Sequence, residues 1–210
     1  MLDFIRLNGK KFLRFLRSLK DIKTHMRITE ADEIARRYLV MNGFDGILTV
    51  LGLIVGAYSV GNIDPRIIIG AGIGTVFALG ISGISGSYMA EKAERKRKLL
   101  MLEKAMLKSL DNSMISEAST TIPILTALIN GLSPAVGGFV VLSPFILSIF
   151  GYFPIEYAFY ASIGLTMLSL FLIGVFIGRI SKENVVLHGF KMALIGLATA
   201  AIILFLKDLY

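Results

Sequence analysis

The chain has 210 residues, of which 55% are hydrophobic, and its mean hydropathy is +0.73. This composition excludes a soluble globular protein, because too few polar residues remain to cover its surface. The formal net charge of +7 would suit a nucleic-acid-binding protein, but the charges stand between long apolar blocks, so we expect no nucleic-acid partner. Cysteine is absent, which excludes disulfide bonds and thiolate metal sites.

Residues 1–33 form a basic amphipathic segment. Within it, Leu2–Lys23 places Phe12, Leu16 and Leu19 at helical spacing, with basic residues on another face. A helix of this kind lies in the membrane interface and binds anionic lipid headgroups. We therefore predict an N-terminal interfacial helix in contact with the bilayer; a solvated basic arm is the alternative.

Five apolar blocks follow, each close to the ~20 residues that cross a ~30 Å hydrocarbon core as a helix. They are Tyr38–Ile63, Ile67–Ala90, Thr121–Leu147, Tyr157–Gly178 and a block from about Val185 to Leu206. In the third, we place Pro123 in the first helical turn, where its missing N–H is harmless, and expect loosening at Gly131–Pro134. A pair of broken half-helices is the alternative there. The predicted fold is an all-α integral membrane protein with a five-helix transmembrane domain over residues 34–210.

The distribution of basic residues predicts how the chain is oriented. Of the lysines and arginines, 20 precede the first block or lie in the second and fourth connections, and only Arg66 and Lys207 lie on the other side. Basic residues collect on the cytoplasmic side of membrane proteins. We expect a cytoplasmic N-terminus and an outside C-terminus, in the cell membrane if the source is prokaryotic.

Asp45 is the single charged residue inside the first block. A span that begins near Tyr38 places Asp45 ~10 Å along the helix axis, where a carboxylate facing lipid is unfavourable. Helical spacing puts it on one face with Thr49, Gly52 and Gly56, and oxygen ligands of this kind suit hard or borderline divalent cations. The rival interpretation is a turn at Asn42–Asp45, with Asp45 capping a helix that begins at Gly46.

The charged connection at residues 91–117 has strong helical propensity, so we expect a cytoplasmic helical extension of the second span. Glu91 and Glu94 are neighbours on that helix and predict a pair of carboxylates that concentrates cations where the span leaves the membrane. Thr49 and Thr75 are candidates for hydroxyl or water-mediated contacts with the metal. A platform that binds a soluble protein is the alternative role for the extension.

Four segments, in order along the chain, resemble the vacuolar iron transporter family. They are Asn42–Val50 (NGFDGILTV), Gly83–Glu94 (GISGSYMAEKAE), Leu132–Pro144 (LSPAVGGFVVLSP) and Gly189–Gly196 (GFKMALIG). The resemblance implies a homodimer of five-helix subunits that exports Fe²⁺ or Mn²⁺ from the cytoplasm, in exchange for protons. It also implies a path between subunits with Asp45 as a ligand midway along it.

The chain departs from that family at two positions of the second helix. Where the family has a glutamate and a methionine, this sequence has Thr75 and Gly83, and its connection at residues 91–117 is short and basic. We expect metal ligands at Asp45, Glu91, Glu94, Thr49 and Thr75, no resident cofactor, and no enzymatic activity, since no nucleophile or acid–base pair is evident. A membrane scaffold or partner-binding protein without transport activity is the alternative function.

Overall fold

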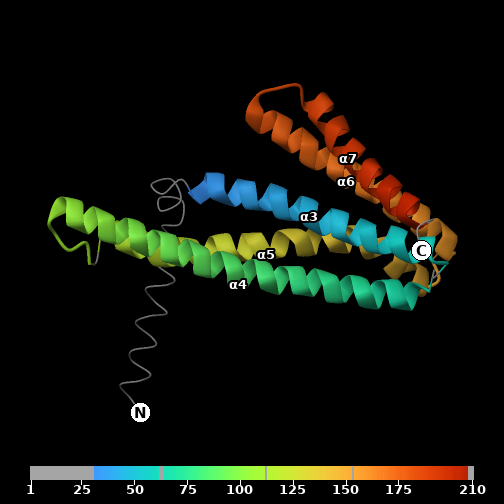
Figure 1. The fold of residues 1–210 in the computed structure, drawn as a ribbon, viewed down its shortest axis with the longest axis horizontal. Coiled ribbons are helices and arrows are strands. Elements are labelled where there is room, and N and C mark those ends of the chain that lie inside the picture. Colours follow the sequence, from blue (N-terminus) through green and yellow to red (C-terminus); the bar gives the residue numbers. More distant parts are fainter. Residues whose placement is uncertain (1–30, 62–63, 112, 153, 208–210) are drawn as a thin grey trace, which may run out of the picture. The chain divides into compact units, whose positions relative to one another are not determined.

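The computed structural model describes residues 31–61, 64–111, 113–152 and 154–207. These residues form five α-helices and no strand: α3 (Ala31–Ser59), α4 (Pro65–Met106), α5 (Met114–Ile149), α6 (Ile155–Ser181) and α7 (Val185–Leu206) (Figure 1). Each helix is long and apolar enough to cross a membrane, so the prediction of five helices of membrane-spanning length is confirmed. The predicted interfacial helix at Leu2–Lys23 lies outside the described residues.

The described residues divide into two compact units. The first contains residues 31–37 and Gly83–Asn130, and the second contains Tyr38–Ser82 and the chain from Gly131 onward. Because α3, α4 and α5 each contribute to both units, the two are described in turn.

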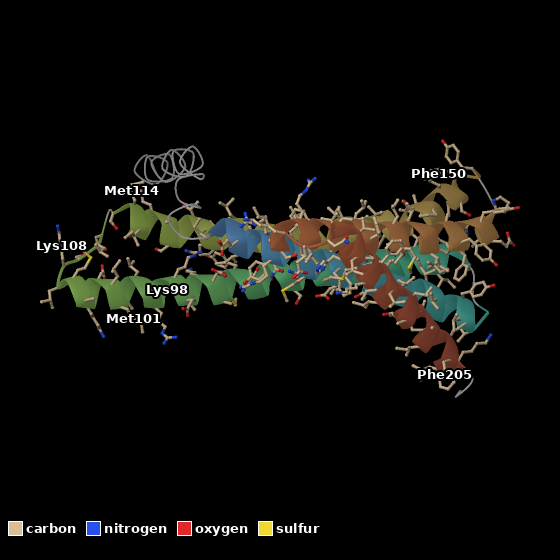
Figure 2. All side chains as sticks on the ribbon, turned by 90° about the horizontal axis from the view of Figure 1, so that it is seen from above. Lys98, Met101, Lys108, Met114, Phe150 and Phe205 are labelled. Atoms are coloured by element: carbon tan, nitrogen blue, oxygen red, sulfur yellow. The ribbon has the colours of Figure 1, made fainter. Side chains whose placement is uncertain are left out.

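In the first unit, the end of α4 and the beginning of α5 form a helical hairpin, marked in Figure 2 by Lys98, Met101, Lys108 and Met114. The extension expected over residues 91–117 is helical only to Met106, and the chain turns before α5 begins. Leu107 has a left-handed backbone with φ of 50°, and the Glu103 carboxylate accepts a hydrogen bond from the Leu110 amide at 2.9 Å. These local bonds end α4, although helical propensity continues.

In the second unit, side chains of α3, α4, α5 and α6 pack into one apolar core. It contains Ile47, Val50, Ile54, Ile68, Val76, Val141, Leu142, Phe145, Ala158, Phe159 and Leu170. The Ser162 hydroxyl of α6 donates to the Val141 carbonyl of α5 at 2.8 Å, and the rings of Tyr58 and Phe159 stack with centroids 4.0 Å apart. This core fixes which faces of α3 and α4 point outward.

Helices α6 and α7 form an antiparallel pair within the second unit (Figure 1). A Cβ added at Gly174 would lie 2.4 Å from the His188 carbonyl oxygen, so only glycine permits this approach. Asn184 caps α7 by accepting hydrogen bonds from the Val186 and Leu187 amides. The turn between the two helices is therefore short and defined by its own side chains.

The prolines of α5 lie inside an unbroken helix, contrary to the sequence-based expectation for Pro123. The helix begins at Met114, so Pro123 is not in its first turn, and no break separates two half-helices. Pro144 removes the N–H that would bond the Val140 carbonyl, and the Ser143 hydroxyl donates to that carbonyl at 2.7 Å instead. The helix tolerates this proline because a neighbouring side chain replaces the lost donor.

Large apolar side chains cover the outer surface of the helices. In α6 and α7 they include Leu168, Leu172, Leu194, Leu197 and Phe205, which Figure 2 labels near the end of α7. Such a surface is stable against lipid hydrocarbon and not against water. The chain is an integral membrane protein.

Candidate metal site

Helix α3 passes through Asn42–Asp45 without a break, so Asp45 lies in the helix interior. The alternative in which Asp45 caps a helix beginning at Gly46 is therefore wrong. The Asp45 side chain is exposed, and so is that of Thr49, one turn further along the same face. A membrane-spanning helix thus carries a carboxylate and a hydroxyl on its outer surface.

The packing of α3 on α5 turns Asp45 outward. A Cβ added at Gly46 would lie 2.3 Å from the Pro134 carbonyl oxygen, and one added at Gly137 would lie 2.8 Å from the Gly43 carbonyl oxygen. Gly43 and Gly46 therefore hold the backbones of α3 and α5 in direct contact, on the same side as buried Ile47. Asp45, between the two glycines, points away from α5.

The rest of the Asp45 face is made of small or polar residues. A Cβ added at Gly56 would meet no atom within 4 Å, whereas one added at Gly52 would lie 3.5 Å from the Ile203 side chain of α7. The Thr49 hydroxyl donates to the Asp45 backbone carbonyl at 2.6 Å, which leaves its oxygen lone pairs able to accept. Asp45 and Thr49 can supply oxygen atoms to a cation on this surface.

Thr75 lies half-buried on α4 in the same unit as Asp45. Its hydroxyl donates to the Ala71 backbone carbonyl at 2.8 Å, one helical turn earlier. The Thr49 hydroxyl on α3 makes the same kind of bond to the Asp45 carbonyl. No hydrogen bond joins Thr75 to Asp45 in the part of the chain that the structure describes. Thr75 therefore provides a hydroxyl group on another membrane-spanning helix and does not bind Asp45 directly.

The two glutamates predicted at the end of the second span have different environments. Glu91 has a side chain that is 12% exposed and lies 3.5 Å from the Arg95 guanidinium. Glu94 is 51% exposed, with Arg97 and Lys98 each at 3.9 Å. Both glutamates belong to the first unit, whereas Asp45 belongs to the second. Within the described residues, no three acidic, histidine or cysteine side chains gather in one place.

Sequence reasoning missed a polar contact between α4 and α5 at Gly83. The Asn130 side-chain amide donates to the Gly83 carbonyl at 3.1 Å, and the buried Ser87 hydroxyl donates to the same oxygen. The signal in the sequence was Asn130 itself, an amide inside a long uncharged run. At Gly83, where the family pattern has a methionine, the backbone carbonyl of this chain accepts hydrogen bonds from two side chains.

Comparison with known proteins places the chain in a family. Residues 96–206, just over half of the chain, match the sequence model of the VIT family. A protein from Methanocaldococcus jannaschii, described as uncharacterized, is 40% identical over 191 residues, which cover 90% of this chain and 94% of that relative. The resemblance to this family is thereby confirmed, and the matched residues include two of the four segments, Leu132–Pro144 and Gly189–Gly196. The chain belongs to the VIT family, and this membership identifies it as a membrane transporter of metal ions.

Proposed function

We propose that this transporter exports Fe²⁺ or Mn²⁺ from the cytoplasm in exchange for protons, with Asp45 as the central ligand. The observation that carries the proposal is the exposed carboxylate of Asp45 in the interior of a membrane-spanning helix. A carboxylate facing lipid is unfavourable, so this face of α3 requires a water-filled path, an ion or another protein surface.

The donor atoms favour this substrate class. Asp45 and Thr49 offer carboxylate and hydroxyl oxygens, which suit hard or borderline divalent ions, and cysteine thiolates are absent from the sequence. A carboxylate that releases its metal when it takes up a proton supplies a simple means of exchange. The choice of Fe²⁺ or Mn²⁺ among divalent ions follows the family resemblance.

A homodimer with the path at its interface accounts for the outer faces of α3 and α4. Gly70, Gly74, Ala78 and Ser82 recur every four residues on the exposed side of α4, and nothing lies within 4 Å of a Cβ added at Gly70 or Gly74. Small residues let helix backbones approach closely in lipid, where packing supplies the attraction. A second copy bound to these faces would cover Asp45 with protein instead of lipid.

Glu91, Glu94 and Thr75 have secondary roles in this proposal. Glu94 is the more accessible carboxylate for collecting cations from the cytoplasm, because Glu91 is largely buried beside Arg95. The count of 20 basic residues against 2 supports a cytoplasmic N-terminus and export toward the other side. Thr75 contributes through water where the path passes α4.

The test is metal flux into proteoliposomes that contain a trapped fluorescent metal indicator. Asp45→Asn keeps the size of the side chain and removes its charge, so Mn²⁺ and Fe²⁺ flux should fall to the rate of empty liposomes while the dimer persists. Glu156→Gln is the matched control, because it removes an exposed carboxylate in the first turn of α6. Unchanged flux in Asp45→Asn would refute the role of Asp45, and absence of flux in the unmodified protein would favour the scaffold alternative.

A further inference from the structure

A basic band follows directly after the apolar part of α4. Residues 91–98 contain five basic and two acidic side chains, and the four exposed cations are Lys92, Lys96, Arg97 and Lys98. The fifth, Arg95, is largely buried beside Glu91. The band therefore presents an excess of positive charge to its surroundings.

The position of this band along α4 corresponds to the headgroup layer of a bilayer. Residues 67–90 carry no charge, and α4 continues as one helix to Met106. At 1.5 Å per residue, Lys92 and Lys96 lie about 3 and 9 Å beyond Ala90 along the helix axis. A headgroup layer is roughly 5–8 Å thick on each side of the hydrocarbon core, so Lys92 lies within this layer and Lys96 lies at its outer edge, where a long lysine side chain can reach the lipid phosphates.

Tyr88 holds Lys92 at this depth. The Lys92 ammonium lies 3.3 Å from the Tyr88 hydroxyl and 5.2 Å from the centre of its ring. Tyrosine favours the boundary between hydrocarbon and headgroups, and Lys96 is one helical turn beyond Lys92 on the same face. The three residues therefore follow one another along one face of α4, the aromatic ring first and the two lysines after it.

Carboxylates within the chain leave this surface available to an external anion. Glu91 pairs with Arg95, and Glu94 lies near Arg97 and Lys98 at 3.9 Å. In the described part of the chain, neither Lys92 nor Lys96 forms a salt bridge. Two neighbouring ammonium groups are complementary to a phosphate with a net negative charge.

We propose that Tyr88, Lys92 and Lys96 form a binding surface for anionic phospholipid headgroups in the leaflet where α4 leaves the membrane. Lipid fits this surface better than a soluble partner, because a phospholipid places its phosphate against the lysines and its glycerol and upper acyl chains against the tyrosine ring. The surface is independent of Asp45, so it does not depend on the metal that the protein transports.

The experiment measures lipid selectivity in phosphatidylcholine bilayers that contain the full-length protein. Spin-labelled phosphatidylglycerol and spin-labelled phosphatidylcholine give a relative association constant at 50 mM NaCl. Lys92→Gln/Lys96→Gln should lower the preference for phosphatidylglycerol about fivefold or more, the contribution expected of at least one lysine at the surface. Lys92→Arg/Lys96→Arg keeps both charges and should retain the preference, which separates charge loss from misfolding.

Lys104→Gln/Lys108→Gln is the matched control, since it removes the same charge from exposed positions further from the membrane. Lys104 lies about 18 Å beyond Lys92 along the helix, more than the screening length of about 14 Å at 50 mM salt. Equal loss in the two double variants, or loss in neither, would overturn the proposal. Inorganic phosphate at constant ionic strength should leave the preference intact, because the proposed surface also contacts the glycerol and acyl chains of the lipid. Loss of the preference would show that the lysines bind the free anion equally well, and would overturn the assignment to lipid.

Discussion

Replacing Gly46 by alanine tests the close approach of α3 to α5 that turns Asp45 outward. The new Cβ would lie 2.3 Å from the carbonyl oxygen, 2.5 Å from the Cα and 2.7 Å from the carbonyl carbon of Pro134. All three are backbone atoms of an interior helical residue, so no side-chain rotation relieves the overlap. The two helices must separate by about 1 Å, which loosens the packed core around Ile47 and Val50.

Two opposing effects determine the expected change in the free energy of unfolding. Overpacking of this severity costs about 3 kcal/mol, whereas alanine is preferred over glycine in a helix by about 1 kcal/mol. The net loss is about 2 kcal/mol, which corresponds to a fall in melting temperature of about 4–8 °C for a chain of this size. Misplacement of Asp45 should reduce metal flux in the same variant.

Thermal unfolding in detergent, followed by fluorescence-detected size exclusion, measures this effect. Gly164→Ala on α6 is the matched control, because Gly164 is also inside a helix, is exposed, and has no atom within 4 Å of the added methyl. That variant should be as stable as the unmodified protein or slightly more so. A Gly46→Ala protein that melts within about 1 °C of the control would refute the direct contact between α3 and α5.

Three further predictions concern the metal, the dimer and the topology. Acidification should weaken Mn²⁺ binding to the unmodified protein, measured by calorimetry, because protons compete with the metal for the Asp45 carboxylate. Mn²⁺ binding to Asp45→Asn should not change with pH. An equal change with pH in both proteins would contradict the role of Asp45. Gly74→Leu places a large side chain on the open face of α4 and should convert the dimer to a monomer, as measured by light scattering. Gly164→Leu should remain a dimer. A dimer in both variants would show that this face of α4 is not the dimer interface. Labelling of both termini in sealed vesicles should place the N-terminus in the cytoplasm and the C-terminus outside, and labels on the same side would contradict five membrane crossings.

Part of the candidate site could be predicted from sequence, because a charged side chain is rare in a membrane-spanning segment and therefore stands out. A single carboxylate within an uncharged block marked Asp45, and the four-residue spacing placed Thr49 beside it. The sequence did not decide between a helix and a turn at Asn42–Asp45, since asparagine, glycine and aspartate suit both. Packing of Gly43 and Gly46 against α5 favours the continuous helix, and this contact joins residues about 90 positions apart.

The sequence does contain residues that favour a turn at the end of α4, although the segment as a whole has strong helical propensity. Ser109, Asp111 and Ser113 are turn-forming residues, and their side chains bond to nearby backbone or to each other. The Glu103 carboxylate accepts from the Leu110 amide only after the chain has folded back, so the sequence pattern of residues 91–117 did not reveal it. The exposure of Glu94 and the burial of Glu91 likewise depend on which side of α4 is covered in the folded chain.

The amino-acid sequence alone determined the membrane environment, the five helices of membrane-spanning length and the family, because a hydrocarbon core requires uninterrupted apolar helices and places charges at their ends. Tertiary structure decided which helix faces are covered. Glycine contacts between α3 and α5 bury one side of α3 and leave Asp45 on the other, and the Asn130 amide reaches a carbonyl 47 residues away. These features depend on backbone approach between distant segments, which side-chain periodicity along one helix does not specify.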